Sequence, residues 1–155
     1  MHRSGAPSRA SVLAAGLLAA CGSSSSNPDA GDVVNCQTDA RVSTYTPNMS
    51  VKSSSGVMTF TLVQSTPAPP ARGNDTWTIH VTDASGQPLP NLSVSVLPFM
   101  PDHGHGTSVN ASVTANGGGD YTVTPLYFFM PGVWRIRFTS AGSTDTTDFW
   151  FCIPG

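Results

Sequence analysis

The chain has 155 residues, only 10% of them charged, and a formal net charge of −2. Its nine acidic residues are all scattered aspartates, set against seven Lys and Arg. This balance repels a phosphate backbone and excludes nucleic-acid binding, and scattered aspartates do not make an acid-rich site for cations.

The N-terminal residues predict export. Arg3 and Arg9 are followed by an apolar run, ASVLAAGLLAA, that is too short to span a bilayer as a helix. The sequence LAAC at 18–21 resembles a bacterial lipobox, in which the Cys becomes the first mature residue and carries the lipid. Residues 1–20 are therefore predicted to be a lipoprotein signal peptide and Cys21 the lipidation site. The alternative is an ordinary secretory signal with an incidental Cys.

Two features after the signal concern location and tethering. Gly22, in place of an Asp, favours the outer membrane over the inner membrane, with the protein facing the periplasm or the surface. The stretch GSSSSNPDAGD has no apolar residue larger than Ala, so residues 21–35 are predicted to be a flexible Ser-rich linker. The folded domain is expected over residues 36–155.

Cys36 and Cys152 lie near the two ends of this domain. Outside the reducing cytoplasm they are expected to form a disulfide. The bond would close a loop of over a hundred residues, which the chain-entropy model values at about 4–5 kcal/mol, less any strain. The alternative is that one of them is a free, metal-binding thiol.

Apolar residues alternate with a period of two from residue 57 onward. Turn residues divide this pattern into seven predicted strands, at 57–65, 76–83, 92–97, 108–115, 120–125, 132–140 and 146–152. The pattern indicates an all-β fold, an immunoglobulin-like Greek-key β-sandwich of about seven strands. Tyr121, after a Gly/Asp turn, resembles the tyrosine corner of such sandwiches. Residues 37–56 either add an edge strand or wrap the sandwich.

The loop PFMPDHGHGTSV (98–109) holds Met100, His103 and His105. The two histidines are two residues apart, so on an extended backbone both rings project to one side, and flanking glycines allow them to converge. Thioether and imidazole together favour Cu(I), whereas histidines alone also serve Cu(II) or Zn(II). Met130 lies in a second turn, FFMPGVW, that an immunoglobulin-like topology could bring to the same end.

The segments FMPDHGHG, GGGDYTV and FFMPGVWRIRF together resemble the YtkA-like domain family, over roughly residues 57–140. Its members are small bacterial extracytoplasmic immunoglobulin-like modules, often lipoproteins, and the resemblance implies copper handling outside the cytoplasm, in some members with cytochrome oxidase assembly. Met100, His105, Met130 and Trp134 match the family pattern. His103 stands where Met is usual, which makes the site harder and less selective for Cu(I).

These residues also have structural interpretations. The two methionines can fill gaps in the core, and the two histidines can be solvated residues of a Gly-rich loop. Trp134 alternates with Ile136 and Phe138 and is expected in the core. His80 is expected on the outward face of its strand. Asp102 either orients an imidazole or only forms the turn.

The predicted function is a lipid-anchored module that binds copper, favoured as Cu(I), with Cu(II) or Zn(II) as alternatives, for trafficking or sequestration. The predicted metal ligands are Met100, His103, His105 and Met130. The predicted partners are the membrane, through the lipid, and an envelope copper-acceptor protein. The alternative is an immunoglobulin-like structural or interaction module that works without metal. An enzyme is not expected, because the chain has no G-x-S-x-G elbow, no free Cys nucleophile and no Glu.

Overall fold

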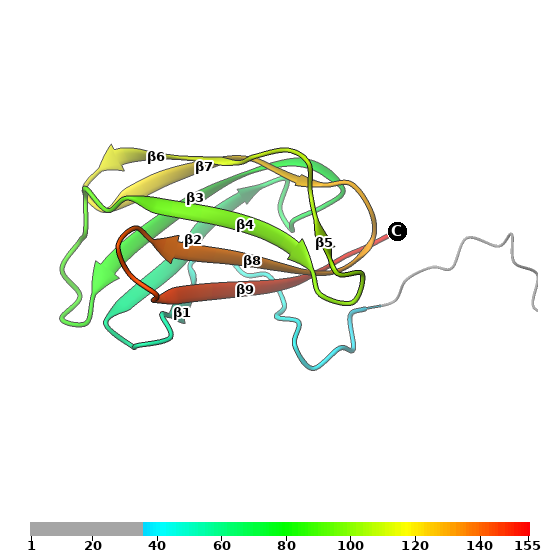
Figure 1. Cartoon of the computed structure of the whole chain (residues 1–155), viewed down its shortest axis with the longest axis horizontal. Helices are drawn as coiled ribbons and strands as arrows, with labels where there is room; N and C mark the ends of the chain where they lie inside the picture. Colours follow the sequence, from blue (N-terminus) through cyan, green and yellow to red (C-terminus); the bar gives the residue numbers. More distant parts are fainter. Residues whose placement is uncertain (1–35) are drawn as a thin grey trace, which may run out of the picture. The chain divides into compact units, whose positions relative to one another are not determined.

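The structure, a computed structural model, describes residues 36–155 (Figure 1). The predicted signal peptide (1–20), the lipidation site Cys21 and the linker (21–35) lie outside these residues. Within 36–155 there is no helix that could cross a membrane. Nine strands are described: β1 (Met49–Lys52), β2 (Met58–Thr66), β3 (Gly73–Asp83), β4 (Val94–Met100), β5 (His105–Gly106), β6 (Ser112–Gly117), β7 (Asp120–Phe128), β8 (Gly132–Ser140) and β9 (Thr146–Ile153).

The strands form two antiparallel sheets, in the orders β1-β2-β3-β7-β6 and β5-β4-β8-β9. An immunoglobulin domain divides its strands A to G into an A-B-E-D sheet and a C-F-G sheet. The seven predicted strands, taken in chain order as A to G, divide in the same way. The predicted sandwich is therefore confirmed, with β1 and β5 as additions at sheet edges.

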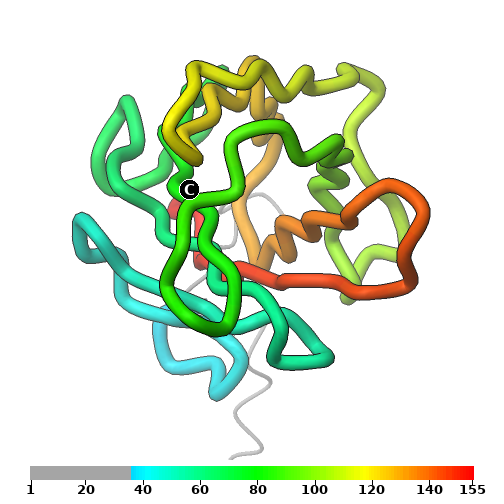
Figure 2. The backbone as a smooth tube through the Cα atoms, turned by 90° about the vertical axis from the view of Figure 1, so that its left-hand side faces the viewer, coloured from blue at the N-terminus to red at the C-terminus, as the bar shows by residue number. Residues whose placement is uncertain are grey.

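The two ends of the sandwich carry different connections. Figure 2 looks onto the end that holds the β1–β2, β3–β4, β6–β7 and β8–β9 turns. The β4–β5 loop and the β7–β8 turn lie at the opposite end, together with the C-terminus (Figure 1). The predicted ligand residues thus fall at one end of the fold.

Alternation places large aromatic side chains between the sheets. Trp77 of β3 is fully buried and meets Phe149 and Phe151 of β9 edge-on, at centroid distances of 6.0 and 5.6 Å. Trp134 of β8 is also fully buried, which confirms its predicted place in the core. Such interlocked rings fix the spacing of the sheets, because each ring fills space that water would otherwise occupy.

The third predicted strand was expected to end before Pro98, and this was wrong. β4 continues to Met100, and Pro98 pairs with Ile136 of β8. The Pro98 carbonyl oxygen points toward Gly106 of β5. In a strand, the nitrogen and the carbonyl oxygen of one residue point to the same side. The nitrogen of Pro98, which carries no hydrogen, therefore points toward β5 and away from β8. No ladder bond to β8 is lost, so the proline is tolerated within the strand.

Tyr121 is not the tyrosine corner that its sequence context suggests. It lies at the start of β7, the fifth of the seven strands, whereas the corner belongs to the sixth. Its buried hydroxyl donates to the Leu89 carbonyl and accepts from the Leu92 N–H (2.9 Å). Tyr121 therefore anchors the β3–β4 connection, about thirty residues upstream, rather than a local turn.

Residues 37–56 do both things that the sequence left open. Met49–Lys52 form β1, which pairs with β2 at the edge of the five-stranded sheet. The preceding segment runs beside β9, where the Ser43 N–H donates to the Trp150 carbonyl (3.0 Å). We call residues 36–45 the lead-in.

Asp75 of β3 is a fully buried carboxyl group. Burial raises its pKa from 3.8 to about 7, although a hydrogen bond from the Ala71 N–H (3.3 Å) works against that rise. At pH values between 3.8 and about 7, Asp75 is protonated in the folded chain but has lost its proton in the unfolded chain. Folding stability therefore falls as the pH rises through this window.

We expect the free energy of unfolding of Asp75→Asn to depend less on pH between about 4 and about 7, because the asparagine amide has no proton to release in this range. The free energy of unfolding, measured by urea denaturation at several pH values between about 4 and about 7, checks this. Asp83→Asn is the matched control, since Asp83 is a turn carboxylate whose pKa is lowered by hydrogen bonds, first from Ser85. An unchanged slope in Asp75→Asn would contradict the assignment.

Candidate metal-binding site

The loop between β4 and β5 is a tight turn, not the extended backbone expected from the sequence. The N–H groups of His103 and Gly104 both donate to the Met100 carbonyl, at 3.2 and 2.9 Å. Gly104 has a φ of +70°, a conformation that favours glycine. The turn still brings the two imidazoles together, with the His103 and His105 ring centroids 5.7 Å apart.

The short strand β5 places His105 beside Met100. The two residues are directly opposite in the antiparallel β4–β5 pair, so their side chains share a face of the sheet. The next residue, Gly106, approaches β4 closely: a Cβ on it would lie 2.7 Å from the Pro98 carbonyl oxygen. Glycine at 106 is thus what allows this pairing.

Gly132, at the start of β8, lies beside two of the predicted ligands, Met100 and His103. It has a φ of +135°, and a Cβ placed on it would lie 2.7 Å from the Met100 methyl carbon and 4.0 Å from His103 Nε2. The bare backbone of Gly132 therefore makes room for a thioether and an imidazole. Together with His105, the structure gathers three of the four predicted ligands at this end.

The three donors differ in exposure. Met100 is fully buried and belongs to the core, His105 is half-buried, and His103 is exposed. The His105 ring stacks on Phe129 at 5.6 Å with an interplanar angle of 28°. A metal arriving from solvent would meet the imidazoles first and the thioether last.

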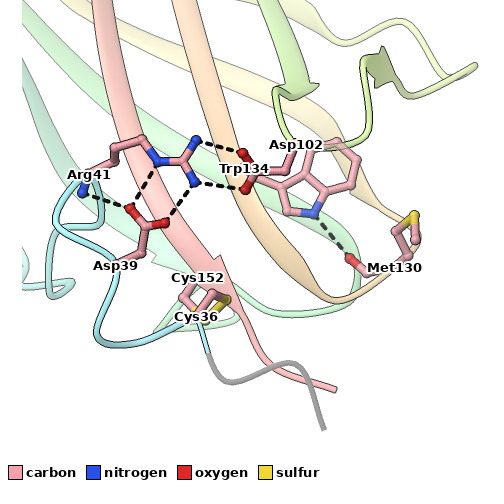
Figure 3. Close-up of a disulfide and its surroundings, with 7 residues drawn as sticks. All are labelled: Cys36, Asp39, Arg41, Asp102, Met130, Trp134 and Cys152. Atoms are coloured by element: carbon pink, nitrogen blue, oxygen red, sulfur yellow. Dashed lines mark hydrogen bonds and ion pairs between the residues drawn. A yellow bond between two sulfur atoms is a disulfide. The ribbon is translucent and has the colours of Figure 1, made fainter. Parts of the chain in front are cut away.

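Met130, the fourth predicted ligand, lies in the β7–β8 turn at the same end. Its carbonyl accepts the indole N–H of Trp134 (3.0 Å), as Figure 3 shows. Its half-buried side chain packs against the core. The structure links this turn to the histidine loop through Phe129, whose ring lies between His105 and Trp134.

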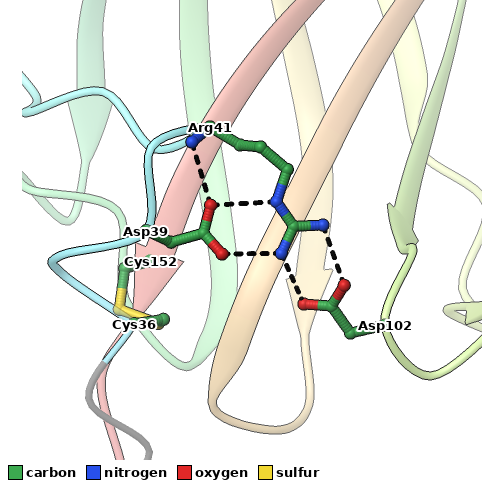
Figure 4. Close-up of polar contacts among 5 residues, drawn as sticks. All are labelled: Cys36, Asp39, Arg41, Asp102 and Cys152. Carbon is green, nitrogen blue, oxygen red and sulfur yellow. Dashed lines mark hydrogen bonds and ion pairs between the residues drawn. A yellow bond between two sulfur atoms is a disulfide. The ribbon is translucent and has the colours of Figure 1, made fainter.

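Arg41 of the lead-in was not singled out by the sequence, yet it holds the histidine loop (Figure 4). Its guanidinium donates to both carboxylate oxygens of Asp102, at 2.8 and 2.7 Å, and to both oxygens of Asp39, at 2.9 and 2.7 Å. It also lies over the Trp150 ring, 5.7 Å from the centroid. Asp102 therefore neither orients an imidazole nor only forms the turn, because it ties the loop to the lead-in.

These ion pairs shift the acidities at the site. Hydrogen bonds from Arg41 lower the pKa of Asp39 to about 2 and lower the pKa of Asp102 as well. Both carboxylates therefore stay charged and paired near neutral pH. Arg41 and Asp102 are 61 residues apart, so no local pattern could have revealed the pair.

The predicted disulfide between Cys36 and Cys152 is confirmed, and it begins the lead-in. Beside it lies an open pocket of about 320 Å³ that extends to the histidine loop. It is lined by Cys36, Thr38, Asp39, Asp102, His103, Gly132 and Val133.

His80 faces outward, as predicted, and its Nδ1 lies 2.6 Å from an Asp120 oxygen on the neighbouring strand. Over the described part of the chain, no three His, Cys, Asp or Glu side chains gather closely enough to hold a metal ion. The candidate ligands at the β4–β5 loop are therefore two imidazoles and a methionine thioether.

The sequence model of the YtkA-like family matches residues 52–139, more than half of the chain. The chain belongs to the YtkA-like family. In this YtkA-like protein the matched segment runs from the end of β1 almost to the end of β8 and contains all four predicted metal ligands. The two disulfide cysteines and Arg41 lie outside it. No curated protein and no solved structure matches the chain.

Replacing Gly106 with Ala should separate β5 from β4. The added Cβ meets a backbone oxygen that cannot swing aside, so we expect a loss of about 1–3 kcal/mol in unfolding free energy. We also expect nuclear Overhauser contacts between the His105 and Phe129 rings to disappear. Gly155→Ala is the control, because its Cβ would lie at an ordinary 3.6 Å from Pro131. Ring contacts that persist in Gly106→Ala would contradict this reading of β5.

Proposed function

We propose that this YtkA-like protein binds copper at the β4–β5 loop as a cargo that it carries or sequesters. The observation that carries the proposal is that Met100 and His103 lie beside the bare backbone of Gly132, while His105 lies opposite Met100 and has its ring 5.7 Å from that of His103. One soft thioether and two borderline imidazoles form a donor set suited to Cu(I), and the imidazoles alone also suit Cu(II) or Zn(II). Met130 is the proposed fourth ligand, from the turn that Phe129 joins to the loop.

The arrangement suits transfer more than permanent storage. The exposed His103 and half-buried His105 offer a metal an accessible first contact. An exposed ion pair between Arg41 and Asp102 joins the loop that carries them to the lead-in. A partner protein with a deeper site could therefore take the ion, so the proposed partner is a copper acceptor of the cell envelope.

A metal-free role is the second candidate, and the burial of Met100 favours it. A fully buried methionine packed among core residues is also what simple gap filling produces. In that case the protein is an immunoglobulin-like structural or interaction module of the envelope. Neither proposal includes catalysis.

The test is a competition titration of the chain with Cu(I), kept reduced by ascorbate, and parallel titrations with Cu(II) and Zn(II). We expect one Cu(I) per chain, and a loss of affinity of tenfold or more when His103 and His105 are both changed to Ala. Met100→Leu and Met130→Leu keep the side-chain volume but remove the sulfur, so each should weaken Cu(I) binding without unfolding the domain. His80→Ala is the control and should bind like the parent chain.

The other outcomes of this titration decide between the remaining proposals. Binding of Cu(II) or Zn(II) that depends on the histidines alone would mean that His103 has redirected the site away from Cu(I). No binding of any of the three metals would leave the interaction module.

We further propose that Cys21 carries a lipid that anchors the protein in the envelope, with the outer membrane favoured. The proposal rests on the LAAC sequence and the short apolar run before it. Cys21→Ser should therefore release the protein from the membrane fraction after cell breakage, as detected by immunoblotting. A variant that still sediments with membranes would contradict the anchor, and Ser23→Ala is the control for changes next to the cleavage point.

A further inference from the structure

The disulfide and the histidine loop share a pocket. Cys36 and His103 both line the open pocket of about 320 Å³, as do Gly132 and Val133. Val133 is directly opposite Cys152 in the β8–β9 pair, while its neighbour Gly132 lies against His103. Cys36 and a predicted copper ligand therefore line the same space.

The two cysteines are held differently. Cys152 lies within β9, where the ladder with β8 fixes its backbone, and it lines a separate hollow with Tyr45 and Phe151. Cys36 lies outside every strand, and its carbonyl accepts one turn bond from the Asp39 N–H (3.2 Å). If the S–S bond opened, Cys36 would be the thiol that is free to move toward His103.

The lead-in would stay near the loop without the disulfide. Arg41, five residues after Cys36, pairs with both oxygens of Asp102, which is the residue next to His103 (Figure 4). The Ser43 N–H holds the same segment to β9. Opening the S–S bond thus exposes a thiol beside the loop rather than releasing the whole segment.

We propose that Cys36 is a redox-controlled copper ligand. In the oxidised chain its sulfur is held in the disulfide and the loop offers only thioether and imidazole donors. In the reduced chain the Cys36 thiolate joins His103, and a thiolate is the softest donor available to Cu(I). The inference rests on the proposed copper function, and it assigns the disulfide the role of setting the affinity.

The reductant is a protein dithiol. One of its thiolates attacks the Cys36 sulfur from the pocket, the S–S bond breaks, and Cys152 leaves as a thiolate that takes up a proton. The second thiol of the reductant then attacks the mixed disulfide and releases Cys36. The reductant becomes a disulfide, the cysteine pair gains two electrons and two protons, and Cu(I) binding displaces the proton from Cys36.

Two single variants test the proposal, each in the full chain carrying Cys21→Ser so that no third thiol interferes. Cys152→Ser leaves Cys36 free beside His103, whereas Cys36→Ser leaves Cys152 free in the other hollow. Both lose the same cross-link, so each controls for the destabilisation of the other. We expect Cys152→Ser to bind Cu(I) at least about tenfold more tightly than Cys36→Ser in an anaerobic competition titration. Equal affinities would overturn the proposal.

A second measurement uses the same Cys21→Ser chain with both domain cysteines intact, reduced with a dithiol that is then removed. Cu(I) should slow the alkylation of Cys36 but not of Cys152, as followed by mass spectrometry of the two peptides. His103→Ala should abolish this protection. Equal protection of both thiols would overturn the assignment even if the single variants fail to fold.

A Cu(I) titration of the oxidised chain distinguishes a failure of this inference from a failure of the proposed function. If the oxidised chain binds Cu(I) and the two variants do not differ, the Met and His site stands and the role of Cys36 fails. If the oxidised chain binds no Cu(I) but Cys152→Ser does, the role of Cys36 stands and the thioether–imidazole site fails.

Discussion

The close approach between the Met100 side chain and the backbone of Gly132 organises the end of the sandwich on which the candidate site lies. β8 can begin there only because Gly132 has no Cβ to meet the Met100 methyl group. The register of β4 on β8 carries Met100 inward, and the register of β5 on β4 then brings His105 opposite it. A side chain at 132 would collide with Met100 on the neighbouring strand β4 of the same sheet, so the missing Cβ supports the packing at this end and leaves room for the proposed site.

The contact between Met100 and Gly132 favours core packing but makes Met100 hard to reach for the proposed metal ion. Met100 stabilises the core because its side chain is fully buried, whereas a metal ligand must be accessible to an incoming ion. In the proposed site the exposed His103 would ease this conflict, because an imidazole at the rim could receive the ion before any core residue moves. Under this proposal, an imidazole in place of a second thioether makes the site less selective for Cu(I) but easier for the ion to reach. The ion pairs of Arg41 limit how far the loop can open, since they join it to a segment that is covalently attached to β9.

The sequence predicted what depends on local periodicity and missed what depends on distant partners. Alternation identified seven strands, and the division of those strands between two sheets followed from the immunoglobulin pattern. The strand β5 was missed because two residues are too few to show an alternating pattern. The predicted end of β4 came too early because the sequence does not tell which side of the strand the nitrogen of Pro98 faces. The histidine pair was found from spacing, although the turn that joins the rings is not the extended backbone assumed. The role of Arg41 could not be predicted, because its partner Asp102 is 61 residues away and only the fold brings the two together.

The lead-in has a further consequence for how copies of the chain meet one another. β9 is the outer strand of its sheet, and such a strand can extend a sheet by pairing with a strand of another molecule. Here the N–H groups of Ser43 and Ser54 donate to the carbonyls of Trp150, near the middle of β9, and of Thr146, its first residue. An approaching strand would have to displace both before it could pair along the edge. The lead-in, together with the β1–β2 turn, therefore also protects the sandwich against edge-to-edge aggregation.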